Sequence, residues 1–202
     1  MNRIVPPVTF FLILLIGLVY GLSVLTGPDI VRLFALWPSG SGGIFQTWQL
    51  ITYGFLHGSV LHLAFNLFAL WLFGSDLERR WGGSRYLFTF LFSVAVAAMT
   101  QIVVGGYFIQ APGPVVGASG GVFGLLLAWA LYFPTRTISF IFLPFIRIPA
   151  RTFVLGYAAI ELYLGVTNTA AGIAHFAHLG GLFGGWLAVQ YFRGRGLFGK
   201  WG

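Results

Sequence analysis

The sequence predicts an all-α membrane protein, a bundle of six transmembrane helices forming a single domain over residues 1–202. Three observations carry this prediction. Of the residues, 58% are hydrophobic and only 7% are charged, a composition typical of chains that lie in lipid. Apolar stretches long enough to cross the hydrocarbon recur six times along the chain. Almost all basic residues fall on one side of these stretches.

The six apolar stretches define the expected spans, and the loops between them are too short to hold a second fold. The first stretch is longer than the apolar region of a signal peptide and has no Ala-x-Ala site at its end, so we expect it to be retained. The short segment before it argues against an added soluble domain or an organelle address. The expected spans cover residues 8–26, 61–74, 86–105, 119–133, 152–167 and 172–192.

The basic residues are distributed asymmetrically between the loops. With an inner amino terminus and six crossings, all but Arg32 of the 11 Lys and Arg residues lie on the inner side. This bias sets orientation in membranes, so we expect both termini to face the cytoplasm, and a bacterial inner (plasma) membrane is the favoured location. Topology thereby accounts for the net charge of +7, and no basic stripe remains to indicate a nucleic-acid partner.

Two connections are unusually apolar. The outer loop, residues 27–56, is rich in aromatic residues that prefer the interface, so we expect it to lie partly in the outer leaflet: Trp37, Phe45, Trp48 and Tyr53. The connection 134–151 contains "FIFLPFIRIP" with two interrupting prolines, and we expect it at the inner interface. A charged run after the second span is expected to be a solvated anchor: Asp76, Glu78, Arg79 and Arg80.

Polar residues within the spans are costly in lipid, so their positions are informative. The second, fourth and sixth spans enter from the outer face, and each carries polar side chains in its first turns. These are His62 and Asn66 in "HGSVLHLAFN", Ser119 in "VGASGG", and His175 and His178 in "AHFAHLGG". Each of the two pairs shares a helix face, because its members are three or four residues apart. We therefore expect all these groups at one depth, just below the outer surface.

Glycines accompany the serine and the second histidine. Small residues four apart let helix backbones approach closely in lipid, so we expect the fourth and sixth spans to pack through them and bring Ser119 within hydrogen-bond reach of His178. The glycines also leave backbone amides near the serine open to a substrate carbonyl. They are Gly117, Gly120, Gly121 and Gly124 beside the serine, and Gly180, Gly181, Gly184 and Gly185 after the histidine.

A serine beside a neutral histidine can act as a nucleophile, because the imidazole accepts the hydroxyl proton as the oxygen attacks a carbonyl. The histidine then returns that proton to the leaving amine. His62, Asn66 and the amide of Ser119 are suitable donors for the oxyanion that develops. No aspartate lies near this depth, so the sequence predicts a Ser119–His178 dyad rather than a triad.

These motifs resemble the rhomboid family of intramembrane serine proteases, and the resemblance covers nearly the whole chain. It rests on "HGSVLHLAFN", "GASG" and "HLGGLFGG", in this order and at matching depth. The resemblance implies a rhomboid-like six-helix bundle and a Ser–His dyad that cleaves transmembrane segments of other membrane proteins. It implies that Ser119 is the nucleophile and His178 the general base, with His62 and Asn66 supporting the oxyanion hole. No metal or organic cofactor is implied, and membrane lipids and a transmembrane protein substrate are the expected partners.

Two positions depart from the family pattern. Trp48 falls where the family often has tryptophan followed by arginine, but the next residue is Gln49, which puts arginine-based anchoring of that loop in doubt. Many members carry a tyrosine four residues after the nucleophile, stacked on the catalytic ring. Phe123 stands here, so the resemblance implies ring stacking without the hydroxyl.

Each polar residue also has a structural interpretation. A helical serine can bond the carbonyl one turn back, and a histidine or asparagine can tie two helices together. His57 and His175 lie near the mouth, where water can solvate them, and a structural or interfacial role is favoured. Glu161, in the fifth span, could orient a histidine, but we favour a protonated or hydrogen-bonded packing role.

Other functions compete with proteolysis. A metal or haem site could use the four histidines, but it would leave Ser119 and its glycines unexplained, and cysteine is absent. A transporter would need polar groups that continue inward through the spans. A noncatalytic rhomboid-like protein that binds membrane clients would be expected to lack the serine or the histidine. The soluble hydrolase elbow, which "GASGG" also matches in spacing, needs a preceding strand.

Overall fold

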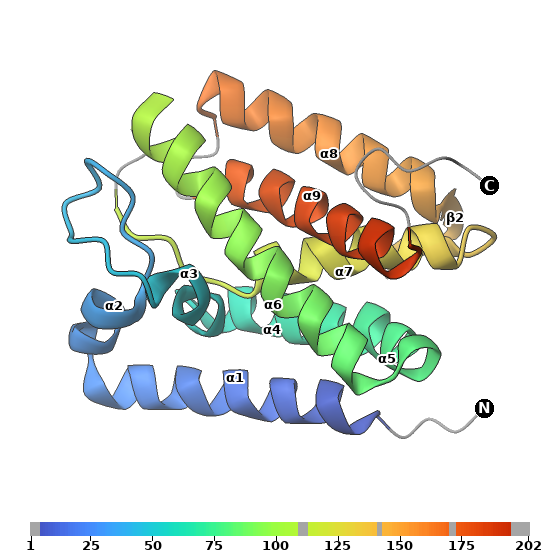
Figure 1. Ribbon diagram of the computed structural model, residues 1–202, viewed down its shortest axis with the longest axis horizontal. Coiled ribbons are helices and arrows are strands. Elements are labelled where there is room, and N and C mark those ends of the chain that lie inside the picture. Colours follow the sequence, from blue (N-terminus) through green and yellow to red (C-terminus); the bar gives the residue numbers. More distant parts are fainter. Residues whose placement is uncertain (1–4, 109–112, 141–142, 170–172, 195–202) are drawn as a thin grey trace.

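The computed structural model describes residues 5–108, 113–140, 143–169 and 173–194. The described part is a bundle of helices with one short β-hairpin (Figure 1). Its elements are α1 (Pro7–Thr26), α2 (Pro28–Phe34), α3 (Gln49–Thr52), the 3-10 turn η1 (Tyr53–Phe55), α4 (Val60–Ala69), the π-helical η2 (Leu70–Gly74), α5 (Ser75–Trp81), α6 (Gly83–Thr100), the π-helical η3 (Gln101–Phe108), α7 (Ser119–Tyr132), β1 (Thr137–Phe140), β2 (Leu143–Pro149), α8 (Ala150–Thr167) and α9 (His175–Phe192).

Long helices lie where the sequence predicts spans. Within the described residues, three are long and apolar enough to cross a membrane: Pro7–Thr26, Val60–Trp81 and Gly83–Phe108. A shorter apolar helix covers Ser119–Tyr132. The second of the long helices continues through η2 and α5 to Trp81, beyond the predicted end at residue 74, because the charged run that follows is helical too. The structure is therefore a helical bundle of a kind that fits a membrane protein, and the count of six crossings stays a prediction.

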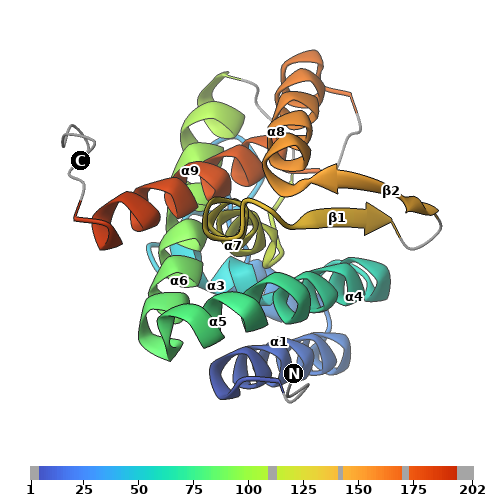
Figure 2. The ribbon, with the colours of Figure 1, turned by 90° about the vertical axis from the view of Figure 1, so that its right-hand side faces the viewer.

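The centre of the bundle is formed by α6, α7 and α9, which pack most extensively against one another. In Figure 2, α7 lies in the middle, with α4 and α5 below it, α6 and α9 to the left and α8 above. Large side chains fill this core with almost no exposure, among them Tyr86, Phe90, Leu70 and Leu125. α7 is therefore enclosed by other helices.

The two ends of the bundle differ, and we name them for their contents. Figure 1 shows α2 and α3 at one end, the loop end, and the hairpin at the other, the hairpin end. α1 begins at the hairpin end, α7 and α9 run toward it, and α8 runs the opposite way. Polar groups at the amino-terminal ends of α7 and α9 therefore lie toward the loop end.

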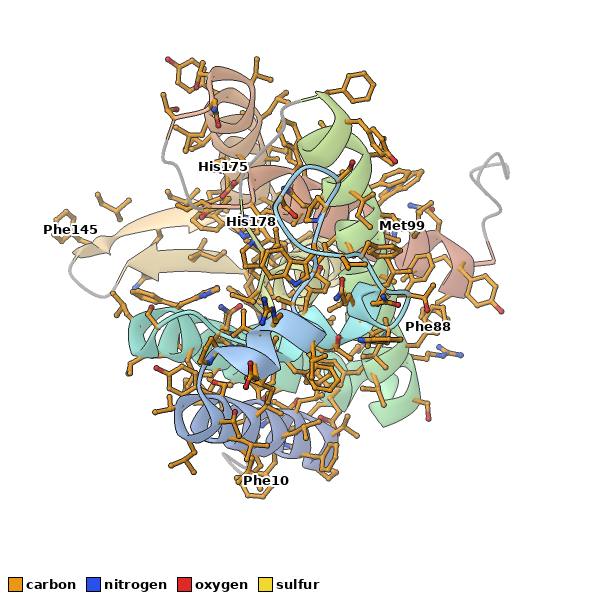
Figure 3. The ribbon with its side chains drawn as sticks, turned by 90° about the vertical axis from the view of Figure 1, so that its left-hand side faces the viewer. Phe10, Phe88, Met99, Phe145, His175 and His178 are labelled. Atoms are coloured by element: carbon orange, nitrogen blue, oxygen red, sulfur yellow. The ribbon has the colours of Figure 1, made fainter. Side chains whose placement is uncertain are left out.

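The outside of α1 carries large apolar side chains that contact little of the protein. Phe10 is 51% exposed and Leu18 70% exposed, and Figure 3 shows Phe10 pointing away from the bundle. In water such a surface would be costly, whereas in lipid it is the expected exterior of a spanning helix.

The connection after α7 forms an antiparallel hairpin that the sequence does not predict. β1 pairs with β2 from Thr137 opposite Pro149 to Phe140 opposite Leu143, with an irregularity after Ser139. Phe145 is 78% exposed near its tip. The prolines that suggest an irregular excursion stand on a two-stranded ribbon, where a strand edge without a partner tolerates a missing N–H.

Two expectations about polar or aromatic surface residues are wrong. Tyr53 of the outer loop is 1% exposed, and its hydroxyl donates a hydrogen bond of 2.9 Å to the Val94 carbonyl, so it belongs to the core rather than to an interface. Glu78 is 5% exposed and is no solvated anchor. Its carboxylate accepts hydrogen bonds from the first turn of α1, which a sequence segment read alone does not reveal.

Candidate active site

The turn before α7 is fixed by Tyr53 and His57, two residues from the segment between α3 and α4. The Gly117 N–H donates to the Tyr53 carbonyl at 3.0 Å, and the Ala118 N–H donates to His57 Nε2 at 3.4 Å. Gly117 has a φ of +132°, which side chains other than hydrogen rarely permit. Ser119 then starts the helix. The location of the serine at a helix amino terminus is thus set by contacts from residues more than 60 positions earlier.

Ser119 and His178 meet across the contact between α7 and α9. The Ser119 Oγ and the His178 Nε2 lie 2.9 Å apart, within hydrogen-bond distance. Both side chains are partly buried, and Figure 3 shows His178 in the interior of the bundle. A hydroxyl and an imidazole nitrogen at this distance form the pair that nucleophilic catalysis requires.

Glycines make this approach possible. A Cβ on Gly181 would overlap the carbonyl oxygen of Gly120, and one on Gly185 would overlap that of Gly124. The backbones of α7 and α9 therefore touch directly at both of these positions, as the small-residue spacing predicts. Gly121 faces α6 instead, where a Cβ would contact the Phe90 ring.

The His178 ring has an aromatic ring on one face and a carboxylate at one edge. The Phe123 ring stacks on it, with centroids 4.5 Å apart and an interplanar angle of 24°. On its far edge, the His178 Nδ1 lies 3.1 Å from the Glu161 Oε1, although the N–H direction falls short of a well-aligned hydrogen bond. The ring is thus fixed on one face and approached by an acid at the nitrogen that does not face Ser119.

The carboxylate departs from the expectation of a site without an acid. Glu161 is 3% exposed, and His175 is 5% exposed. The His175 Nδ1 lies 2.6 Å from the other oxygen, Oε2, and its Nε2 lies 3.3 Å from the Thr169 carbonyl oxygen. His175 is therefore buried and bonded rather than solvated at the mouth. A signal was present, because Glu161 is six residues before the end of α8, about 9 Å along the helix, at a depth that α9 reaches within its first turn.

His62 lies at the turn before the serine. A Cβ on Gly117 would come within 2.7 Å of the His62 Nε2 and 3.7 Å of the Ser119 Oγ, so the ring and the hydroxyl border the same glycine. His57 packs on His62 with ring centroids 4.9 Å apart. It is only 6% exposed, which corrects the expectation that water solvates it.

Asn66 is buried one turn further along α4. Its side-chain N–H donates to the His62 carbonyl at 2.9 Å, and the residue is 6% exposed. The amide is thus engaged on its own helix, on the face that it shares with His62.

The described residues contain no group of three or more His, Cys, Asp or Glu side chains arranged to hold a metal ion. His175 and His178, the two histidines that a metal site would draw from α9, both face the carboxylate of Glu161.

Comparisons with known proteins agree on one family. A family model described as the Rhomboid domain matches residues 45–195. The rhomboid protease GluP of Bacillus subtilis (strain 168) is 33% identical over 144 residues, which cover 71% of this chain and 26% of that protein. The rhomboid proteases GlpG of Yersinia pestis and Yersinia pseudotuberculosis are each 32% identical over 100 residues, covering 50% of this chain and 36% of each relative. The chain thus matches about a quarter to a third of the length of these relatives.

Proposed function

The chain belongs to the rhomboid family, and from this premise we propose that it is an intramembrane serine endopeptidase. Ser119 is the nucleophile and His178 the general base. The observation that carries the proposal is the 2.9 Å contact between the Ser119 Oγ and the His178 Nε2, made by side chains from two helices whose backbones touch. A structural serine would instead bond a carbonyl of its own helix.

The geometry supports a two-step hydrolysis. As the Ser119 Oγ bonds to the carbonyl carbon of the substrate, its proton passes to the His178 Nε2. The tetrahedral adduct then collapses, the C–N bond breaks, and His178 gives the proton to the leaving amine. Water then attacks the acyl carbon and gives a proton to the His178 Nε2. As the bond between this carbon and the Ser119 Oγ breaks, His178 returns the proton to the Oγ, and the acid product leaves.

The amino terminus of α7 supplies donors for the oxyanion. A helix begins with four N–H groups that have no acceptor within the helix. At α7 the first of them, on Ala118, is taken by His57, which leaves the amides of Ser119, Gly120 and Gly121. His62 and Asn66, on the neighbouring α4, are the proposed side-chain supports. Removing one such donor typically costs about 3 kcal/mol of transition-state stabilisation.

We propose the predicted topology for the membrane as well, with six spans, one domain and both termini on the cytoplasmic side of an inner membrane. The exposed apolar surface of α1 supports burial in lipid. The hairpin end carries Arg136, Arg147 and Arg151, as the positive-inside rule requires for the cytoplasmic face. The loop end then faces outward, and Ser119 opens toward it.

The proposed substrate is a transmembrane segment of another membrane protein. A helical backbone is already hydrogen-bonded, so such a segment must unwind locally before its scissile carbonyl can reach Ser119. The reaction as proposed uses the side chains and amides of this chain and requires neither a metal nor an organic cofactor.

A serine-directed fluorophosphonate tests the proposal on the full chain in detergent or liposomes. We expect the probe to label Ser119, identified by peptide mass spectrometry, and to block cleavage of a model transmembrane substrate. His178→Ala should remove the labelling while the protein stays folded. Labelling of another residue, or none in folded protein, would contradict the proposal and favour a noncatalytic protein that binds membrane clients.

A further inference from the structure

We propose that Glu161 positions the general base, so that Ser119, His178 and Glu161 act as a triad whose acid comes from α8 and is itself held by His175. This role rests on the proposed protease function and adds a residue to it. Glu161 faces His175 and His178 rather than Ser119, so it acts through His178.

Glu161 approaches the ring nitrogen of His178 that does not face Ser119. Nε2 faces the serine at 2.9 Å, and Nδ1 faces the Glu161 Oε1 at 3.1 Å. The side chain of Glu161 is 4% exposed and that of His178 13% exposed, so water competes little for either group. Catalytic hydrogen bonds that are loose in a free enzyme commonly tighten when substrate is bound.

His175 fixes the direction of the carboxylate. Its Nε2 faces the Thr169 carbonyl, which can only accept, so this nitrogen carries a proton. Its Nδ1 faces the Glu161 Oε2 at 2.6 Å, within hydrogen-bond distance. With Oε2 held in this way, Oε1 is directed at His178 rather than free to rotate.

The arrangement selects one tautomer of His178. Neutral imidazole carries its proton on one of the two nitrogens, and only the form with the proton on Nδ1 leaves a lone pair on Nε2 for the Ser119 hydroxyl. A carboxylate at Nδ1 favours this form because it accepts that N–H. It also stabilises the imidazolium that arises when His178 takes the serine proton. Besides His175, two described titratable groups interact with this pair: Tyr157 with Glu161 and His62 with His178.

A purely structural role for Glu161, tying α8 to α9, predicts a different outcome on substitution. The chain offers a matched reference, because Glu78 is also a buried glutamate but accepts hydrogen bonds from Val8 and Thr9 of α1. Loss of charge at Glu78 should weaken the fold without touching the reaction. Loss of charge at Glu161 should slow the reaction in protein that remains folded.

The experiment compares the full chain with Glu161→Gln and Glu78→Gln in the same liposomes. Thermal unfolding gives the folded fraction, and the measured quantities are kcat and KM on a model transmembrane substrate and the rate of fluorophosphonate labelling at Ser119. We expect Glu161→Gln to lower kcat and the labelling rate about 10–100-fold, with KM within about twofold. For Glu78→Gln we expect both rates to stay within about twofold.

The outcomes separate the two proposals. If the probe labels Ser119 of the wild-type protein and folded Glu161→Gln keeps an unchanged kcat, only the role of Glu161 is overturned. Failure of wild-type Ser119 to react at all would overturn the protease function and, with it, this role.

A second measurement on the wild-type chain does not depend on a variant that folds. With ¹⁵N-labelled histidine, the nitrogen shifts report which ring nitrogen carries the proton, and the His178 signals are assigned by their loss in His178→Gln. We expect the proton on Nδ1 at neutral pH. A neutral ring with its proton on Nε2 would overturn the proposal.

Discussion

Two carboxylates are buried in the described part of the chain, and they are held by different kinds of donor. Glu78 accepts from the Val8 N–H at 2.9 Å, the Thr9 N–H at 2.7 Å and the Thr9 hydroxyl at 2.8 Å. Glu161 faces the rings of His175 and His178 instead. Amides and hydroxyls do not exchange protons with a carboxylate near neutral pH, whereas imidazoles do.

This difference shows that a buried glutamate can either stabilise helix packing or take part in proton transfer. α1 begins at Pro7 without a side-chain cap of its own, and Glu78 satisfies amides of its first turn and complements the helix dipole. That contact is fixed in one state. The Glu161 contact changes whenever His178 gains or loses a proton, so it is suited to a catalytic cycle.

The largest expected effect is a loss of activity at Ser119 without a loss of stability. Ser119→Ala should lower substrate cleavage by at least about 10³-fold, because no nucleophile remains, while the free energy of unfolding changes by about 1 kcal/mol or less. Cleavage assays and thermal unfolding in the same detergent measure both. Ser23→Ala is the matched control, since its hydroxyl bonds the Tyr20 carbonyl on α1 and should not affect cleavage. Cleavage by Ser119→Ala at the wild-type rate would refute the assignment of the nucleophile.

At Glu78, the structural carboxylate, the expected loss is in stability. Glu78→Ala leaves two buried donors of Thr9 and one partly buried donor of Val8 without their acceptor, which should cost about 3 kcal/mol of unfolding free energy. Cleavage per folded molecule should stay within about twofold of wild type. A large loss of kcat in fully folded Glu78→Ala would break the division into a structural and a reactive carboxylate.

Disturbing the contact between α7 and α9 should lower both stability and activity, each by less than the changes above. Gly181→Ala forces a Cβ against the Gly120 carbonyl and should cost about 1–3 kcal/mol of stability. It should also lower kcat about 10²-fold, because a displacement of about 1 Å separates Ser119 from His178. Gly17→Ala, with open space around its Cα, serves as control and should be neutral or slightly stabilising. Wild-type kcat in Gly181→Ala would show that the backbone contact does not set the distance.

The smallest expected effect is on pH dependence, through His57 in the loop before α4. Burial, reinforced by the charge of His62, lowers the pKa of His57 to about 4. In the pH range between this value and the usual 6.5, the unfolded chain binds the proton and the folded one does not, so stability is lost as the pH falls. We expect a loss of about 2 kcal/mol between pH 7 and pH 5, measured by unfolding. His57→Asn should show a correspondingly weaker dependence, and an unchanged dependence would contradict this account.

Much of the arrangement could be predicted from the chain because it follows from local patterns. Apolar runs place α1 at Pro7–Thr26, against an expected 8–26, and α7 starts at Ser119 as expected. The small-residue spacing predicts that the fourth and sixth spans pack through their glycines. The structure has Gly120 against Gly181, with Ser119 and His178 2.9 Å apart beside this contact.

The remaining features depend on tertiary contacts that no periodicity encodes. Glu78 meets Thr9 across 69 residues and His57 meets Ala118 across 61, so neither partner is visible in a local window. Glu161 lies on α8, which runs opposite to α7 and α9. The depth of Glu161 can therefore be found only once the carboxy-terminal end of α8 is known. The β1–β2 hairpin is hidden by prolines that usually exclude strands.

The direct contact of Gly120 with Gly181 and of Gly124 with Gly185 has a consequence for bilayers of different thickness. Helices adapt to a thinner or thicker membrane mainly by tilting. Since no flexible side chains separate these two backbones, α7 and α9 must tilt as one unit. We therefore expect lipid chain length to alter substrate entry more strongly than the intrinsic reactivity of the serine.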